Sequence, residues 1–588
     1  MALKIKKGKP WPYGVSIWEN HINLAFELPE KKKMNSGRRT RETVTGEENI
    51  SLRIYDLVNH ETEEISLEET WHFGQVYAIA FNEKKPEKYG YQVLQDGVVL
   101  ELPYGGEVCR IKGETVYLFQ LPEFDWAEDA APNLDFDELY IYKLHIRGFT
   151  KQAGSKVEGR GTFEGAVQKI PYLKELGVNA VELMPVYDFH EVIREQCNYW
   201  GYGAANFMAP KPEYALNPEK AGDSFKELVK KFHAEGMEVY LEIMFPEAGF
   251  TERKLACLRH WVLEYHVDGF HLSAGTTAMA EVLSDPVLVN TKIMSENFDG
   301  SQDRNLGKRR GIYHNGFQES MRRFLRGDED SAAAFMNYNL NRSTEQGSIQ
   351  YVTNNNGFTL MDLVSYDGRH NEANGENNLD GTPWNLSWNC GEEGPSRKKD
   401  IIKLRRQQIK NAWIMNIFHQ GTPLIYAGDE FGNTQKGNNN AWCQDNALSW
   451  LNWNLLTKNG WIFEFVKTLI ELRKKEVLLH PVLPFGMDDK SLNGMPDMSF
   501  HGKTPWFVED AGWSRCLGCM YAGEEKAWYF AYNMHTSKEE FALPRSPKNS
   551  KWKVYLDTAE ANEPGIEMKD GRIEVEGHSI VLLYTLYE

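Results

Sequence analysis

The sequence predicts an α/β protein: a (β/α)8 TIM-type barrel flanked by an N-terminal β-sandwich and a C-terminal all-β sandwich. Between about residues 135 and 480, short apolar strands alternate with helical segments over a length that suits such a barrel with inserted loops. Residues from about 10 to 125 and from about 482 to 588 contain short alternating strands separated by turn signals instead. The predicted domains are therefore 1–130, 131–481 and 482–588.

In the two flanking regions the predicted strands are recognised by their alternation of apolar and polar residues. Residues 50–55, 75–81 and 114–119 show it in the N-terminal region, and residues 527–532 and 579–584 show it in the C-terminal region. These patterns predict an antiparallel sandwich on each side of the central domain.

The central region opens with a strand over 140–146, followed by a helix over 163–176 that ends at Gly177. The next strand covers 179–184 and stops at Pro185. Further elements repeat this order: a helix over 223–235 before Gly236, a strand over 237–245, a helix over 255–265 and a strand over 267–272. Such an alternation is typical of a parallel sheet.

Composition excludes several classes of function. With 66 Lys and Arg against 84 Asp and Glu, the net charge is −18, so we expect no nucleic-acid partner. No apolar stretch reaches 18 residues, and the first ten residues lack the apolar run of a secretory signal, so we expect no membrane partner. Seven scattered cysteines fit a reducing cytoplasm, where we expect the protein to act. Cys516 and Cys519 lack a second pair at zinc spacing, so no metal or other cofactor is expected.

Several long motifs together resemble one known family. The matching segments are 142–150, 161–165, 198–202, 207–210, 266–270, 370–376, 385–394, 427–432 and 437–446. They are similar to glycoside hydrolase family 13, and the later ones to its isoamylase and glycogen-debranching branch. The resemblance covers nearly the whole chain and implies that the N-terminal sandwich is a carbohydrate-binding module.

The resemblance also implies where catalytic groups belong. A retaining glycosidase needs two carboxyl groups about 5–5.5 Å apart. At the nucleophile position, however, the chain has Ser273, and at the position of the transition-state-stabilising aspartate it has Asn356. Glu296 keeps the position of the general acid/base. A hydroxyl and an amide carry no charge to stabilise an oxocarbenium-like transition state.

Positions that the family uses to hold the sugar have also changed. His271 replaces an arginine, Asn355 replaces a histidine, and Glu242 and Glu247 replace the acid and the histidine of strand three. Tyr202 keeps the position at which the family stacks a tyrosine under the sugar nearest the cut. We expect these five residues to contact substrate.

The sequence therefore favours a catalytically inactive debranching-like protein that binds an α-glucan of the glycogen or starch type. It could act alone, as a homo-oligomer, or as the partner of an active debranching enzyme. Two alternatives stay open at this point. One is an active α-1,6-glucosidase that uses relocated carboxylates such as Glu247, and the other is an interaction scaffold without sugar affinity.

Overall fold

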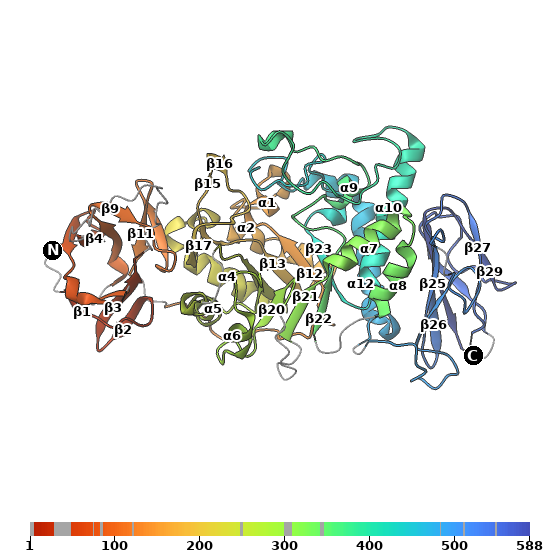
Figure 1. Cartoon of the computed structure of the whole chain (residues 1–588), viewed down its shortest axis with the longest axis horizontal. Coiled ribbons are helices and arrows are strands. Elements are labelled where there is room, and N and C mark those ends of the chain that lie inside the picture. The colour runs from red at the N-terminus through yellow and green to blue at the C-terminus, as the bar shows by residue number, and fades with distance from the viewer. Residues whose placement is uncertain are drawn as a thin grey trace, which may run out of the picture.

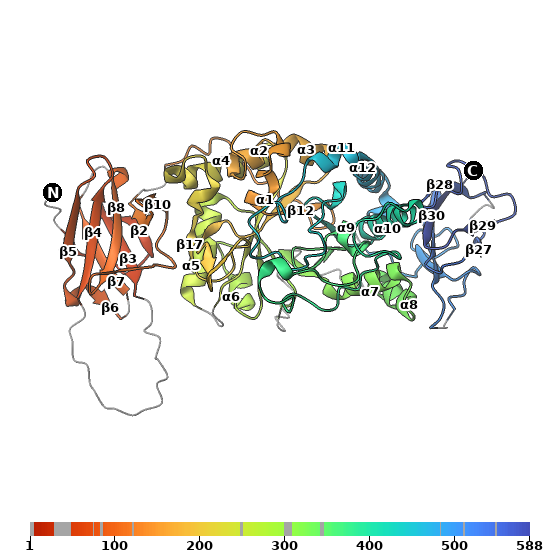
Figure 2. The same ribbon diagram turned by 90° about the horizontal axis from the view of Figure 1, so that it is seen from above.

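The structure, a computed structural model, describes residues 5–28, 49–74, 76–82, 86–119, 123–246, 251–298, 309–340, 346–481, 484–509, 512–546 and 550–587. Three bodies follow one another along its long axis (Figure 1). The N-terminal sandwich lies at one end, the barrel in the middle and the C-terminal sandwich at the other end, and the view from above agrees (Figure 2). The predicted fold class is confirmed. The exact domain limits at 130/131 and 481/482 stay predictions.

Eight parallel strands close the central barrel, and pairing of the first with the last completes the ring. Apolar residues form the larger part of these strands, which are buried on both faces as parallel strands require. In barrel order they are β12 (Ile141–Leu144), β13 (Ala180–Leu183), β18 (Glu238–Ile243), β19 (Gly269–Leu272), β20 (Lys292–Ser295), β21 (Arg310–Tyr313), β22 (Gly347–Gln350) and β23 (Thr422–Tyr426).

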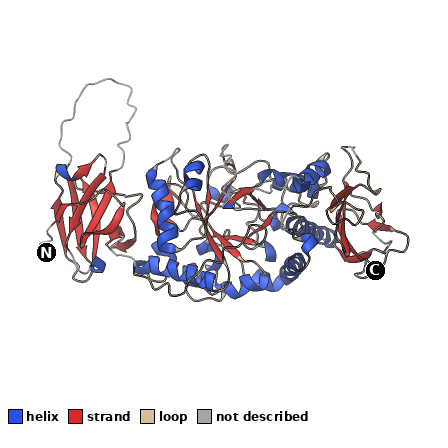
Figure 3. Ribbon diagram, turned by 90° about the horizontal axis from the view of Figure 1, so that it is seen from below, coloured by secondary structure: helices blue, strands red, loops and turns tan. Residues whose placement is uncertain are grey.

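Helices surround this ring of strands (Figure 3). The longer ones are α4 (Ala221–Ala234), α5 (Glu252–Tyr265), α7 (Asn315–Arg326), α8 (Ser331–Leu340), α10 (Lys399–Ile417) and α12 (Gly460–Lys475). The shorter ones are α1 (Ile146–Thr150), α2 (Phe163–Val167), α3 (Ile170–Leu176), α6 (Met279–Ser284), α9 (Leu360–Leu363) and α11 (Asn454–Lys458). None of the helices that the structure describes is long and apolar enough to cross a bilayer.

The single helix predicted over 163–176 is wrong, because the structure divides it into α2 and α3. Pro171 lies in the first turn of α3, where its missing N–H costs nothing, whereas it would break the interior of a continuous helix. The predicted end is confirmed: Gly177 has φ of 95° and its N–H donates to the carbonyls of Leu173 and Lys174.

The N-terminal sandwich has two antiparallel sheets around a core of its own. Ala209 is the one barrel residue that the described part of this core includes. The first sheet contains β1 (Ile5–Lys7), β2 (Gly14–Trp18), β3 (His21–Glu27), β6 (His72–Phe73) and β7 (Val76–Phe81). The second contains β4 (Ile50–Asp56), β5 (Thr62–Ser66), β8 (Tyr89–Gln95), β9 (Val98–Leu100), β10 (Val108–Ile111) and β11 (Glu114–Leu118).

The C-terminal sandwich instead shares a core with the barrel. Along β25, Leu517 and Cys519 pack toward the barrel helices, whereas Cys516 and Met520 pack inside the sandwich. Both cysteines are free and buried on one strand, as ordinary strand residues. The five-stranded sheet comprises β24 (Met498–His501), β25 (Cys516–Ala522), β26 (Lys526–Asn533), β30 (Ser579–Leu586) and β28 (Lys553–Asp557), and a second sheet pairs β27 (Glu539–Ala542) with β29 (Arg572–Val575).

Candidate functional site

Four charged or titratable side chains meet inside the barrel near the carboxyl ends of its first four strands. They are Lys143 on β12, Glu182 on β13, Glu242 on β18 and His271 on β19. Strand register brings them together, because Lys143 pairs with Glu182 and Glu242 pairs with His271. All four are buried. Barrel enzymes build their active sites at this end of the strands.

Lys143 is the centre of this group. Its Nζ lies 3.0 Å from Oε1 of Glu182 and 3.1 Å from Oε2 of Glu242. Burial opposes the charge on Lys143, but the two carboxylates outweigh it and hold its pKa well above the usual range. Burial likewise opposes ionisation of Glu182, yet Lys143 and His271 lower its pKa to about 2. Lys143 therefore acts as an internal counterion for two acids.

His271 extends the network toward solvent. Its Nδ1 lies 2.9 Å from Oε1 of Glu182, and its Nε2 lies 3.3 Å from Oε1 of Glu296. The ring stacks on Tyr313 with centroids 4.1 Å apart, and the Tyr313 hydroxyl donates to Glu182. Burial lowers the pKa of His271, but the adjacent Glu182 and Glu296 outweigh it and raise the value to about 9. At neutral pH this side chain is an imidazolium that donates to both carboxylates.

Glu296, at the predicted acid/base position, directly follows β20. Its side chain is 43% exposed, so it forms the solvent end of the network. Burial raises its pKa, but the hydrogen bond and charge of His271 outweigh this effect and lower the pKa below its ordinary value. Glu296 is therefore ionised at neutral pH.

The predicted positions of the nucleophile and the stabiliser lie at the same end of the barrel. Ser273 follows β19 and is partly exposed, and its carbonyl accepts a hydrogen bond from the Thr276 N–H at 3.2 Å. Asn356 is exposed, next to the buried Asn355. Among the described contacts, neither Ser273 Oγ nor the Asn356 amide forms a hydrogen bond with Glu296. The structure thus places Glu296 in the charged network and leaves Ser273 and Asn356 beside it.

The predicted sugar-contacting residues form a second branch of the network. The Tyr202 hydroxyl donates to Oε1 of Glu242 at 2.8 Å, and Nδ2 of Asn355 donates to the Tyr202 oxygen at 3.1 Å. Together with His271, these residues connect strands three, four and seven with the loop that carries Tyr202. Glu247 lies outside the described residues.

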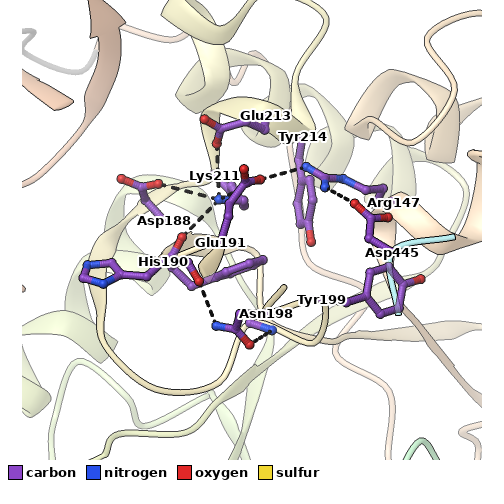
Figure 4. Close-up of polar contacts among 12 residues, drawn as sticks. Arg147, Asp188, His190, Glu191, Asn198, Tyr199, Lys211, Glu213, Tyr214 and Asp445 are labelled. Atoms are coloured by element: carbon purple, nitrogen blue, oxygen red, sulfur yellow. Dashed lines mark hydrogen bonds and ion pairs between the residues drawn. The ribbon is translucent and has the colours of Figure 1, made fainter. Parts of the chain in front are cut away.

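The loop before Tyr202 is anchored by a polar cluster beside the barrel mouth (Figure 4). Nδ2 of Asn198 donates to the carbonyls of His190 and Tyr202, both at 2.9 Å. The fully buried Lys211 lies 3.3 Å from Glu213 and 3.6 Å from Glu191. Arg147 joins this cluster through ion pairs to Asp445 at 2.5 Å and to Glu191 at 3.1 Å. The charges compensate one another, so we regard the cluster as a support for the Tyr202 loop.

Sequence reasoning missed Lys143, Glu182 and Tyr313. A signal was present for the first two: each is a charged residue within a short apolar strand, and residues of such strands are buried on both faces. Opposite charges on the first two strands of a predicted barrel indicate an internal ion pair. In the described part of the chain, no group of three or more His, Cys, Asp or Glu side chains is arranged to hold a metal ion.

Known proteins are similar to this chain in sequence and in fold. The family model described as "Alpha amylase, catalytic domain" matches residues 144–254. The glycogen operon protein GlgX homolog of Mycobacterium tuberculosis is 32% identical over 544 residues, which cover 75% of this chain and 75% of that protein. Isoamylase 3, chloroplastic, of Oryza sativa subsp. japonica is 28% identical over 673 residues and covers 95% of this chain and 84% of its own.

Among solved structures, the pullulanase from Paenibacillus barengoltzii in complex with maltohexaose and α-cyclodextrin superposes with a TM-score of 0.72 at 16% identity, covering 99% of this chain and 96% of that one. The barrel and its flanking sandwiches thus define a protein of the α-amylase superfamily type. Within that class, the chain belongs to glycoside hydrolase family 13, in its isoamylase and glycogen-debranching branch.

Proposed function

We propose that this chain is a non-hydrolytic member of its branch that binds α-glucan of the glycogen or starch type. The observation that carries the proposal is that the acids at the carboxyl ends of the strands, the barrel mouth, are buried and ion-paired. Glu182 and Glu242 are buried against Lys143, and the positions of the nucleophile and the stabiliser hold Ser273 and Asn356. A nucleophilic carboxylate must reach the anomeric carbon in line, and burial against Lys143 opposes that approach for Glu182 and Glu242.

Proton supply supports the same conclusion. The general acid of a retaining glycosidase must be protonated when the leaving oxygen departs, so its pKa is raised in the working enzyme. The His271 imidazolium acts on Glu296 in the opposite direction and lowers its pKa. Glu296 would accept hydrogen bonds from sugar hydroxyls more readily than it would donate a proton.

Support for glucan binding comes from the accessible groups around the network. Tyr202, Asn356 and Glu296 present an aromatic ring, an amide and a carboxylate at one end of the barrel, and the buried Asn355 holds the Tyr202 hydroxyl from behind. Aromatic faces and hydrogen bonds of this kind recognise neutral sugars. The solved pullulanases include complexes with maltohexaose and maltotetraose, and the curated relatives carry names of glycogen and isoamylase proteins.

On this proposal the chain acts alone, as a homo-oligomer, or as a partner of an active debranching enzyme in the cytoplasm. The described cysteines are all free, which supports a reducing compartment.

The test joins two measurements on the purified full chain. Binding isotherms with glycogen, maltoheptaose and a branched dextrin should give dissociation constants of tens of micromolar to millimolar, with little response to salt because the sugars are neutral. A reducing-end assay with glycogen, amylopectin and pullulan should give no product. Flat isotherms would leave only the scaffold hypothesis.

An active α-1,6-glucosidase is the second candidate, because two acids, Glu182 and Glu242, lie within 3.1 Å of one ammonium group inside the mouth. If they or Glu247 act in catalysis, turnover should fall within about a hundredfold of a typical enzyme rate. Glu242→Gln or Glu247→Gln should then abolish it. Such a result would overturn the non-hydrolytic proposal.

A further inference from the structure

A large cleft lies away from the barrel mouth, between α10, α12 and the C-terminal sandwich. Its volume is about 910 Å³, which is within the range of small-molecule sites. Figure 1 shows these helices beside the terminal sheet. The walls are held in place by Gln407 and Asn411 of α10, whose amides donate to the carbonyl of His578. Clefts between domains are common ligand sites.

One wall of the cleft is cationic. Lys399, Lys403, Arg406 and Lys410 recur at spacings of four, three and four residues, so they lie on one face of α10. Lys410 forms an ion pair with Glu560. Within the described structure, no carboxylate lies at ion-pair distance from Lys399, Lys403 or Arg406. In a chain of net charge −18, three such cations at one cleft are unusual.

The cations converge rather than spread apart. The hydrogen bond and charge of Lys410 lower the pKa of Glu560, and the charges of Lys403 and Arg406 add to this effect. All three therefore act on the same carboxylate at the rim. Their positive charge exceeds what Glu560 and Glu464, the two acids that line the cleft, can offset.

Another part of the wall is aromatic. Trp461 and Phe465 of α12 and Tyr555 of β28 line the cleft and are partly exposed. The Arg406 guanidinium lies 5.6 Å from the centre of the Trp461 ring, and Lys410 lies 5.9 Å from it. The cations thus lie directly beside the aromatic rings, and this combination suits a ligand with a ring at one end and a phosphate at the other. A neutral glucan would not need the cations, and a long nucleic acid would meet the acidic remainder of the molecule.

We propose that this cleft binds a small organic phosphate, a ring joined to a phosphate or diphosphate group, with the phosphate on Lys403 and Arg406 and the ring against Trp461. The proposal does not depend on the function assigned to the barrel mouth. Nucleotides and sugar phosphates share this chemistry, and the test distinguishes them.

The test measures binding of ADP, glucose 1-phosphate and inorganic phosphate to the full chain by titration calorimetry at constant ionic strength. We expect ADP or glucose 1-phosphate to bind at least tenfold more tightly than inorganic phosphate. Tighter binding of ADP identifies a nucleotide site, and tighter binding of glucose 1-phosphate identifies a sugar-phosphate site. Equal affinities for all three probes, or no binding, would overturn the proposal.

A matched pair of variants locates the site. Lys403→Ala with Arg406→Ala should weaken binding at least tenfold, and both positions are exposed, so the fold should be retained. Lys220→Ala with Lys475→Ala removes two exposed cations elsewhere and should change affinity less than twofold. Because net charge changes equally in the two variants, a general charge effect would weaken both. Unchanged affinity in the Lys403/Arg406 variant would contradict the assignment.

Discussion

Two buried lysine–glutamate networks lie in the described barrel, one at each end. They differ in how their carboxylates are paired and in whether they reach solvent. At the amino ends of the strands, Lys292 Nζ lies 2.8 and 2.9 Å from the two carboxylate oxygens of Glu238. The Tyr240 hydroxyl and the Leu134 N–H donate to the same carboxylate. At the carboxyl ends, Lys143 serves two acids, and His271 connects one of them to the partly exposed Glu296.

The same pairing of residue types therefore serves two purposes. The network at the amino ends, the lower network, is a sealed ion pair whose acid accepts four hydrogen bonds from three donor groups. The network at the carboxyl ends, the upper network, has more carboxylates than cations and ends in solvent. It lies beside the predicted positions of the catalytic groups. In barrels the lower face contributes stability, and the upper face carries the sites. The two networks therefore differ both in their balance of charge and in their access to solvent.

The largest expected effect comes from removing each lysine in turn. Lys143→Met leaves Glu182 and Glu242 buried together, and we expect it to lower the free energy of unfolding by about 3–5 kcal/mol at pH 7. Lys292→Met should cost about 1–2 kcal/mol less, because burial already raises the pKa of Glu238 despite Lys292, so this acid can take up a proton. Urea unfolding measures both. If Lys292→Met lowered the free energy of unfolding as much as Lys143→Met or more, the proposed difference between the two networks would be contradicted.

The pH dependence of stability should distinguish the two ends next. The folded-state pKa of His271 is raised to about 9 from an ordinary 6.5. Its contribution is therefore fully present below pH 6.5 and is lost as pH rises toward 9. We expect a loss of about 2–4 kcal/mol over this range, measured by urea unfolding.

His271→Gln is the matched variant, and it should flatten this alkaline part of the profile. A parent protein whose stability stays level between pH 6.5 and 9 would show that the imidazolium is not held by Glu182 and Glu296. At acid pH the contributions of the two networks to the stability of the fold should have opposite signs. The lowered pKa of Glu182 stabilises the fold above pH 4.5 and is lost as pH falls toward 2, whereas the raised pKa of Glu238 favours the fold at low pH.

Restoring the family residues tests whether the upper network is still a usable pocket. The variant combines His271→Arg, Ser273→Asp, Asn355→His and Asn356→Asp. We expect measurable but poor hydrolysis of maltooligosaccharide branches, because Lys143 still neutralises the acids behind the mouth and supporting contacts are missing. The variant should also lose about 1–4 kcal/mol of stability.

The control for this restoration is Glu296→Gln in the restored background, which should abolish the gained activity. A folded variant without any activity would show that the cleft has diverged together with its reactive groups. A variant more stable than the parent would contradict the idea that these substitutions relieved strain.

The smallest expected effect concerns Tyr202. Tyr202→Ala should weaken glucan binding about fivefold, roughly 1 kcal/mol, by removing a ring from the mouth. Tyr202→Phe keeps the ring and should retain most of the affinity. Tyr240→Phe changes the lower network and should leave glucan binding unchanged. If Tyr240→Phe weakened binding as much as Tyr202→Ala, the two ends could not be separated by function.

Much of the architecture could be predicted from the sequence because the signals are local. Alternation predicted the sandwiches, and apolar strands between helical segments predicted the barrel. The break between α2 and α3 was missed, since Pro171 was read as part of one periodic segment. The family motifs predicted Ser273, Asn356 and Glu296 as positions of the site, and all three follow barrel strands in the structure.

The sequence by itself determined the prediction of which reactive groups are missing, since the family resemblance puts a serine and an asparagine at the positions of two carboxylates. Only the tertiary structure decided what the remaining charges do. Lys143, Glu182, Glu242 and His271 are far apart along the chain, and barrel closure and strand register bring them within hydrogen-bond distance. In that dry interior, each charge depends on its neighbours more than on its own chemistry, because burial removes the water that would otherwise solvate it.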